Sequence, residues 1–161
     1  MTAPRRCPCA SGLAYPACCG RFHAGAEAPS PEALMRSRYA GFALRAVEYL
    51  ARTLHPDHPD REATPEALRR ALRGACDRFR YPGLTVLDRA GYDPAQAAQV
   101  LFHARVFEAG VDRSFVERSE FRHDGTGWLY RAGELVPAPG AAPAGLTLAG
   151  FEAWAAARKS G

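Results

Sequence analysis

Two segments in the first half of the chain place apolar residues at helical spacing, and each has a clear start. Ser30 and Thr64 both stand directly before a Pro-Glu pair, the order of an N-cap residue followed by proline at the first helical position. The apolar positions that follow are Leu34, Met35, Phe42, Val47, Leu50 and Leu54 after Ser30, and Leu68, Leu72 and Phe79 after Thr64. We predict helices there, with a break near Gly41 and a polar loop over 55–60, where two prolines interrupt helix.

After Tyr81 the apolar residues recur with a period of two, which is typical of β-strands. The predicted strands cover residues 84–90, 98–109, 113–123 and 127–136, with turns at Gly91, Gly110 and Gly125. Helices followed by strands predict an α+β fold with an antiparallel sheet. Beyond the strands, residues 137–146 have the composition of a Pro/Ala/Gly linker. We predict that a short helix over 148–158 docks through Phe151 and Trp154.

Alternation along the strands predicts which side chains face the helices. The inward side chains are Val100, Phe102, Ala104 and Val106, then Phe115, Glu117, Ser119 and Phe121, which leaves His103 and Arg105 outside. Glu117 is therefore a carboxylate among apolar residues, where it needs a partner or a proton. Arg38 lies four residues from both Leu34 and Phe42, on the inward side of the first helix. We predict an Arg38–Glu117 pair, with Tyr39, Ser119 and Tyr130 around it.

This polar cluster of Arg38, Tyr39, Glu117, Ser119 and Tyr130 has two interpretations. The first is a structural ion pair that fixes how the helix packs on the sheet, and breaking such a pair costs about 3–5 kcal/mol. The second is a ligand pocket, in which Arg38 holds an anion that Glu117 or Tyr39 positions. The sequence favours the first interpretation and leaves the second open.

The composition is that of a globular protein of about one domain. Of the 161 residues, 47% are apolar and 24% are charged, which excludes disorder throughout the chain. No apolar run approaches the roughly 20 residues of a membrane-spanning helix, and the basic N-terminus lacks the apolar stretch of a secretory signal. We therefore expect a cytoplasmic protein with no membrane span.

Four of the five cysteines lie within thirteen positions, as Cys7, Cys9, Cys18 and Cys19. Two close-spaced pairs joined by a short loop are typical of structural zinc sites, because Zn²⁺ prefers tetrahedral thiolate and imidazole ligands. Disulfides are disfavoured, since each pair is too close for an easy bridge and a cytoplasmic protein meets reducing conditions. We predict one Zn²⁺ bound by the four cysteines, with His23 as the alternative fourth ligand in a Cys₃His site.

A metal at this position changes the charge balance. The formal net charge is +4, and residues 1–25 hold three arginines, Arg5, Arg6 and Arg21, with no acidic residue. Zinc bound by four thiolates carries −2, which lowers the charge of this segment to +1. The remaining 18 basic and 17 acidic residues give another +1. A broad basic face for nucleic acid is therefore not predicted.

The pattern Cys-Pro-Cys-x-Ser-Gly-x-x-Tyr-x-x-Cys-Cys-Gly over residues 7–20 resembles the SEC-C motif, the zinc knuckle at the C-terminal end of the translocase ATPase SecA. Residues 31–39, 83–86 and 117–121 resemble segments of the YchJ-like family, in which such a knuckle is followed by an NTF2-like domain. The resemblance covers most of residues 5–136.

This resemblance implies an SEC-C-like knuckle over residues 1–25 and an NTF2-like (cystatin-like) α+β domain over residues 30–136. In that fold a curved antiparallel sheet packs on helices and leaves a cone-shaped cavity. The linker and short helix occupy residues 137–161. Relatives often carry a second knuckle at the C-terminus, whereas residues 137–161 contain no cysteine.

The resemblance also implies a docking role, because SEC-C knuckles of the translocase ATPase engage the chaperone SecB and ribosomes. We predict an adaptor whose knuckle binds a protein partner, such as a secretion chaperone or a ribosome. The alternative is a small-molecule binding protein or an enzyme that uses the cavity of the NTF2-like domain. The sequence has no Ser-His-Asp spacing, phosphate loop or open catalytic metal site, which favours the adaptor.

Overall fold

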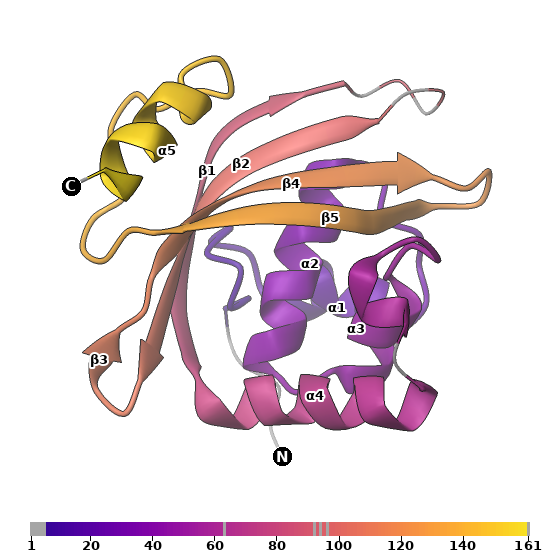
Figure 1. Ribbon diagram of the computed structural model, residues 1–161. Helices are drawn as coiled ribbons and strands as arrows, with labels where there is room; N and C mark the ends of the chain where they lie inside the picture. Colours follow the sequence, from indigo (N-terminus) through magenta and orange to yellow (C-terminus); the bar gives the residue numbers. More distant parts are fainter. Residues whose placement is uncertain (1–5, 63, 92, 94, 96, 161) are drawn as a thin grey trace.

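A curved antiparallel sheet arches over a group of helices in the computed structural model, which describes all residues except 1–5, 63, 92, 94, 96 and 161 (Figure 1). Arg5, counted in the charge balance above, lies outside the described residues. The helices are η1 Tyr15–Ala17, α1 Cys19–His23, α2 Pro31–Ala43, α3 Val47–Arg52, η2 Pro59–Glu62, α4 Pro65–Arg78 and α5 Phe151–Lys159. The strands are β1 Arg80–Ala90, β2 Ala98–Glu108, β3 Val111–Asp112, β4 Phe115–His123 and β5 Trp128–Pro137. The predicted α+β fold is confirmed.

The long strands follow the order β1-β2-β4-β5, and the two-residue β3 pairs with β2. All of these pairings are antiparallel. β1 begins earlier than predicted, at Arg80, because an edge strand tolerates the missing N–H of Pro82. The predicted strand over 113–123 begins only at Phe115, since the Asp112 carboxylate accepts a hydrogen bond from the Ser114 amide (2.9 Å) and bends the chain.

Both helix starts form as predicted. The Ser30 hydroxyl accepts a hydrogen bond from the Ala33 amide at 3.1 Å, and the Thr64 hydroxyl accepts one from the Ala67 amide at 3.2 Å. Each satisfies an amide that has no partner within its helix. None of the helices in the described part of the chain is both long and apolar enough to cross a membrane.

The break between α2 and α3 comes later than predicted. α2 continues through Gly41 to Ala43, and Arg45 makes the turn with a φ of +60°. A Cβ at Gly41 would lie only 3.1 Å from the Leu50 side chain. This glycine therefore stays helical and lets α3 approach α2 closely.

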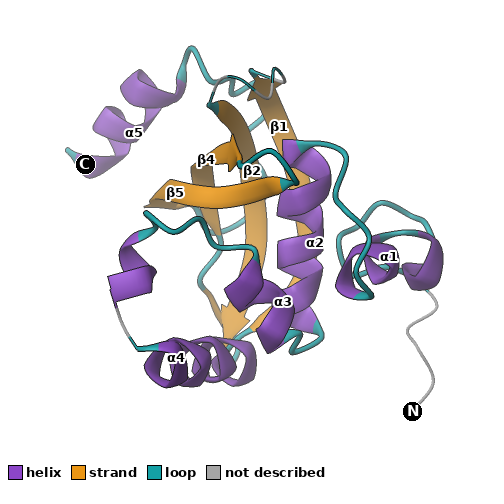
Figure 2. Cartoon of the chain, turned by 90° about the vertical axis from the view of Figure 1, so that its right-hand side faces the viewer, coloured by secondary structure: helices purple, strands orange, loops and turns teal. Residues whose placement is uncertain are grey.

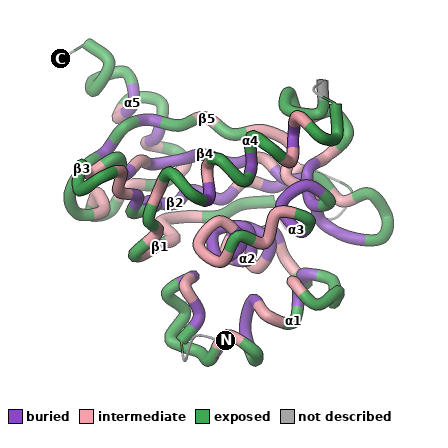
Figure 3. The backbone as a smooth tube through the Cα atoms, turned by 90° about the horizontal axis from the view of Figure 1, so that it is seen from below, coloured by how far each residue is buried: buried purple, intermediate pink, exposed green. Residues whose placement is uncertain are grey.

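α2 is the most enclosed helix of the described chain. Its consecutive residues 37–41 are all buried, so the helix has no side facing solvent there. Figure 2 shows the reason: the sheet lies on one side of α2 and the segment with α1 lies on the other. Figure 3 shows the other buried stretches, among them those of β2 and β4. A helix enclosed in this way must place polar residues where partners exist.

The C-terminal segment covers the convex face of the sheet (Figure 1). Phe151 is fully buried in a cluster with Leu101 and Val116, and Trp154 packs against the cluster, so the predicted docking is confirmed. His103 does point to this face, but it is only 1% exposed, and its Nε2–H donates to the Ala138 carbonyl at 2.9 Å. The predicted outward direction of His103 is therefore correct, but the chain that follows β5 covers the side chain through Ala138.

Removing the Phe151 ring tests this docking. We expect Phe151→Ala to lower the free energy of unfolding by about 3–5 kcal/mol, because the cavity it leaves lies between α5 and the sheet. Val111→Ala is the control: Val111 is 50% exposed, so its loss should change stability by under about 0.5 kcal/mol. Urea titrations of both variants measure the difference, and equal effects would show that α5 is not anchored to the sheet.

Candidate functional site

Four cysteine sulfurs gather beside α2. Cys7, Cys9, Cys18 and Cys19 are all buried, and their Sγ atoms lie within 4.8 Å of one another. The distance is 3.6 Å between Cys9 Sγ and Cys18 Sγ, and 3.9 Å between Cys18 Sγ and Cys19 Sγ. In a tetrahedral site with Zn–S bonds of about 2.3 Å, the sulfurs lie about 3.8 Å apart. The cluster therefore has the size and donor set to hold one metal ion.

Tight turns bring the two cysteine pairs together. The Cys7 amide donates to the Leu13 carbonyl at 2.8 Å, and between them Gly12 has a φ of +85° that favours glycine. Gly20 is needed for a different reason: a Cβ there would lie 2.7 Å from the Tyr15 carbonyl oxygen. The glycine lets η1 and α1 approach closely enough to place Cys18 and Cys19 opposite the first pair.

The sulfurs share protons unequally. A hydrogen bond from Cys19 lowers the pKa of Cys9 to about 4, whereas burial raises the pKa of Cys7 to about 11. The same hydrogen bond also raises the pKa of Cys19. The protein thus stabilises negative charge at one sulfur by keeping protons on others, and a divalent cation would replace those protons.

His23 uses both ring nitrogens outside the sulfur cluster. Its Nε2 lies 2.8 Å from the Ser37 carbonyl, which can only accept, so Nε2 carries the proton. Its Nδ1 then accepts a hydrogen bond from the Tyr15 hydroxyl at 2.7 Å. Burial lowers the pKa of His23, which favours this neutral form. The geometry therefore gives His23 the role of tying the knuckle to α2.

Further contacts join the knuckle to α2 and α3. Ala40 of α2 is fully buried against the sulfurs. The Arg36 guanidinium donates to the Cys9 carbonyl at 2.9 Å, and the Arg52 guanidinium donates to the Phe22 carbonyl at 2.8 Å. The cysteine cluster is consequently built into the body of the protein.

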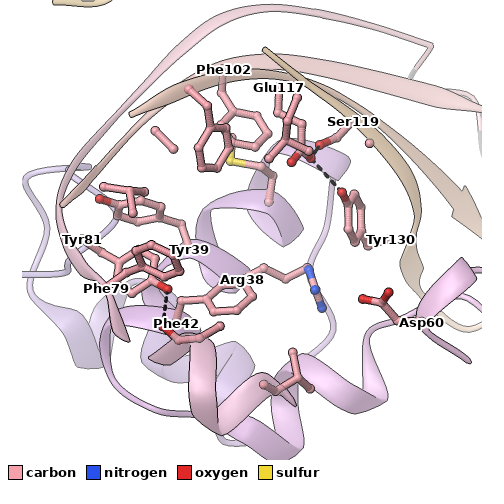
Figure 4. Close-up of a pocket in the computed structure, with 18 of the residues that line it drawn as sticks. Arg38, Tyr39, Phe42, Asp60, Phe79, Tyr81, Phe102, Glu117, Ser119 and Tyr130 are labelled. Atoms are coloured by element: carbon pink, nitrogen blue, oxygen red, sulfur yellow. Dashed lines mark hydrogen bonds between the residues drawn. The ribbon is translucent and has the colours of Figure 1, made fainter. Parts of the chain in front are cut away.

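A cavity of about 900 Å³ lies between the helices and the concave face of the sheet (Figure 4). All members of the predicted polar cluster line it: Arg38, Tyr39, Glu117, Ser119 and Tyr130. Much of the remaining wall is aromatic and consists of Phe42, Phe79, Tyr81, Phe102, Phe115 and Phe121. The hydroxyl of Tyr39 is already used, since it donates to the Arg105 carbonyl at 2.9 Å and accepts from the Gly83 amide at 2.8 Å.

The predicted Arg38–Glu117 pair is not formed. Both side chains are 7% exposed, yet neither belongs to an ion pair among the described residues. Arg38 Nη1 donates instead to the Leu50 carbonyl at 2.8 Å and to the Thr53 hydroxyl at 2.6 Å. The Arg38 guanidinium lies 4.9 Å from the Tyr130 ring centre, and the Tyr130 hydroxyl donates to Glu117 at 2.9 Å. Tyr130 therefore links the two charged groups that were expected to meet directly.

Glu117 is held by neutral hydroxyl groups. Ser119 and Tyr130 both donate hydrogen bonds to its Oε2. Burial raises the pKa of Glu117, although these hydrogen bonds and the charge of Arg38 act in the opposite direction. Burial also raises the pKa of Tyr130, and the charge of Glu117 adds to this effect. The site thus favours the protonated carboxyl more than water does.

The sequence did not indicate that His58 and Asp60 belong to the cavity wall. Both lie in the 55–60 segment that was expected to be a solvated loop. The His58 ring lies 5.0 Å from the Tyr130 ring, because a β-bridge between Leu54 and Tyr130 brings this segment against β5. Such a pairing between distant residues leaves no pattern in the sequence.

Comparison with known proteins decides the family. Residues 30–133 match the profile of the YchJ middle NTF2-like domain. The chain belongs to the YchJ-like family. The UPF0225 protein BPP1723 of Bordetella parapertussis is 37% identical over 137 residues, which cover 83% of this chain and 96% of the relative. The UPF0225 protein YchJ of Shigella dysenteriae is 36% identical over 125 residues, which cover 77% and 79%.

Solved structures agree with this assignment. The solution structure of RPA3114, a SEC-C motif containing protein from Rhodopseudomonas palustris, matches with a TM-score of 0.65 and 33% identity, over 80% of this chain and 96% of that one. The crystal structure of a SEC-C motif containing protein from Psychrobacter arcticus matches with a TM-score of 0.65 over 88% and 86% of the two chains. Its 22% identity supports the fold alone. The predicted NTF2-like fold of the YchJ-like family is confirmed.

Gly133 offers a direct test of the Glu117–Tyr130 contact. A Cβ at Gly133 would overlap the Tyr130 hydroxyl and lie 2.6 Å from Glu117 Oε2. We expect Gly133→Ala to displace both groups and to lower the free energy of unfolding by about 1–3 kcal/mol, as for a buried polar group that loses its hydrogen-bond partner. Gly74→Ala is the control, because Gly74 lies in α4 with nothing near its missing Cβ, and alanine there should stabilise by up to about 1 kcal/mol. Chemical denaturation measures the free energy of unfolding of both variants. If Gly133→Ala is as stable as the natural protein, the described contact is contradicted.

The raised pKa of Glu117 predicts a pH dependence. A carboxyl whose pKa is higher in the folded than in the unfolded chain stabilises below its ordinary pKa, and that stability is lost as the pH rises through the folded value. A glutamine side chain cannot ionise, so we expect Glu117→Gln to gain stability relative to the natural protein between about pH 4 and about pH 8. Chemical denaturation of both proteins across this range measures the difference between their free energies of unfolding. A difference that shrinks as the pH rises would contradict the raised pKa of Glu117.

Proposed function

We propose that this protein binds a small molecule in the cavity and that its N-terminal knuckle holds one structural Zn²⁺. The observation that carries the proposal is the cavity of about 900 Å³, whose wall holds the buried guanidinium of Arg38 and the buried carboxyl of Glu117, neither of which belongs to an ion pair among the described residues. A filled core rarely retains charges in this way, because unpaired buried charges cost several kcal/mol. The volume also lies within the usual range of ligand pockets, about 300–1,000 Å³.

The sulfur geometry supports the zinc part of the proposal. Four thiolates would fill all four tetrahedral positions, which is typical of structural rather than catalytic zinc. Zinc bound by Cys7, Cys9, Cys18 and Cys19 would hold the first twenty residues against α2. We place the protein in the cytoplasm, where reducing conditions keep such thiols available to the metal.

Metal analysis with paired cysteine variants tests the zinc site. We expect one zinc per chain in the purified protein and its loss in Cys9→Ser, with a lower thermal unfolding temperature, because metal binding and folding are linked. Cys76→Ser is the matched control, since Cys76 is a buried cysteine in α4 that lies outside the cluster. It should keep its zinc. A natural protein without stoichiometric zinc, or Cys9→Ser with full zinc content, would contradict the proposal.

A thermal-shift screen tests ligand binding. A compound at about 100 times its Kd stabilises the folded state by about 2.7 kcal/mol, which for a chain of this size raises the unfolding temperature by several degrees. Ala132 lines the cavity, and Ala132→Phe should fill part of it. We expect stabilising compounds that lose their effect in Ala132→Phe. If shifts persist in this variant, or if a broad metabolite screen yields none, the cavity is not a ligand site.

A second candidate is protein docking by the knuckle, and the exposure of Leu13 favours it. This apolar side chain is 54% exposed in the loop between the two cysteine pairs. A secretion chaperone or a ribosome is the partner proposed from the SEC-C resemblance. Leu13→Ser should leave the fold intact and remove such a partner in a pull-down, whereas an identical partner set with both proteins would count against docking.

A further inference from the structure

Arg38 keeps part of its hydrogen-bonding capacity for the cavity. The hydrogen bonds that it makes to the described protein come from Nη1, which leaves the donors on Nε and Nη2. Among the described residues, no fully buried side-chain nitrogen or oxygen lacks a hydrogen-bond partner. These donors are therefore open to the cavity that Arg38 lines. Two such N–H groups on one edge of a guanidinium match the two oxygens of a carboxylate.

The two buried charges of the cavity differ in how they can be neutralised. Glu117 can take up a proton, and burial favours this. Arg38 has no such option, because a guanidinium remains protonated at any physiological pH even where burial lowers its pKa. The fixed charge on the inner wall of the cavity is consequently positive.

Asp60 is the other acidic residue of the cavity wall whose charge acts on Arg38. Figure 4 shows its carboxylate pointing toward the Arg38 guanidinium, but the two form no ion pair within the described chain. The Asp60 side chain is 63% exposed and lies 3.9 Å from His58 Nδ1. A solvated carboxylate that forms no ion pair with Arg38 leaves the guanidinium free for direct contact with a ligand.

The opposite part of the cavity is largely aromatic, and the charged residues that also line the cavity, Arg78, Glu108 and Arg113, are paired with one another. Figure 4 places Arg38, Asp60 and Tyr130 on one side and Phe79 and Tyr81 on the other. The wall therefore combines one cationic end with a broad aromatic surface. A ligand that satisfies both ends needs a charged group joined to an apolar body.

We propose that the cavity binds organic carboxylates that consist of a carboxylate group attached to an aromatic or aliphatic body. Nε and Nη2 of Arg38 donate to the two carboxylate oxygens, and the body packs against the aromatic wall. Glu117 keeps its hydrogen bonds to Ser119 and Tyr130, and its burial disfavours a competing negative charge there. This inference rests on the proposed ligand-binding function and narrows it to one ligand class.

Matched probes test the ligand class. 4-Phenylbutyrate, 2-naphthylacetate and decanoate are titrated by calorimetry against their neutral amides and the corresponding primary amines, which share the same apolar bodies. We expect each carboxylate that binds to have a Kd at least about tenfold lower than that of its amide, the effect of a charged hydrogen bond. Amines should bind more weakly than amides because of the charge of Arg38.

Two variants test which residues of the cavity cause the preference for carboxylates. Asp60→Asn removes the competing carboxylate from an exposed position, so it should lower the Kd of the carboxylates by about threefold or more and leave the Kd of the amides unchanged. Arg38→Met should abolish the preference for carboxylates. Since Arg38 also bonds to Leu50 and Thr53, this variant is used only where its circular dichroism matches the natural protein. The tests with Asp60→Asn and with the matched probes remain valid if Arg38→Met does not fold.

The outcomes separate the inference from the function on which it rests. Carboxylate preference that increases in Asp60→Asn supports the inference. Equal binding of carboxylates and amides, or preference for amines, overturns the inference and leaves the cavity as a ligand site of another class. If no member of the panel binds at millimolar concentration, the proposed ligand-binding function itself is contradicted.

Discussion

Helix α2 is in contact with the cysteine-rich segment on one side and with the cavity on the other, and the arrangement of the whole protein depends on this double contact. One side of the helix carries Arg36, Ser37 and Ala40, which contact the cysteine-rich segment that ends with α1. The other side carries Arg38 and Tyr39, which line the cavity. Burial on both sides removes the solvent-facing stripe that most helices keep. The cysteine-rich segment and the cavity therefore share one wall.

Arg38 is tolerated in this enclosed position because α3 provides acceptors. Its Nη1 donates to the Leu50 carbonyl and the Thr53 hydroxyl at the C-terminal end of α3, where helix carbonyls lack partners and cations are favourable. The Tyr130 ring adds a cation–π contact. These contacts hold the guanidinium without neutralising its charge. The structural role and the proposed anion-binding role are thus compatible, since they use different nitrogens of the same group.

The sequence predicted what depends on local pattern. The N-caps at Ser30 and Thr64, the order of helices and strands, and the inward direction of Glu117 and Ser119 all follow from spacing and alternation. The four cysteines were recognisable for the same reason, because close-spaced thiols have few structural uses apart from metal binding.

What the sequence could not predict depends on contacts between distant residues. Arg38 and Glu117 both face the cavity, but alternation says nothing of the Tyr130 side chain that lies between them. His103 points outward as predicted and is nevertheless buried, because a segment with the composition of a linker folds back over it. Asp60 reaches the cavity because the pairing of Leu54 with Tyr130 brings its segment against β5. Each difference arises from tertiary packing that a local pattern does not encode.

The most direct test of the account is native-state amide hydrogen exchange of α2 with and without metal. If the cysteine-rich segment braces α2 from the side opposite the cavity, removal of zinc by a chelator should reduce the protection of residues 34–43 by at least about tenfold, whereas the amides of α5 on the convex face should change much less. Unchanged protection of α2 in the metal-free protein would show that the knuckle and the cavity are independent and would contradict the account.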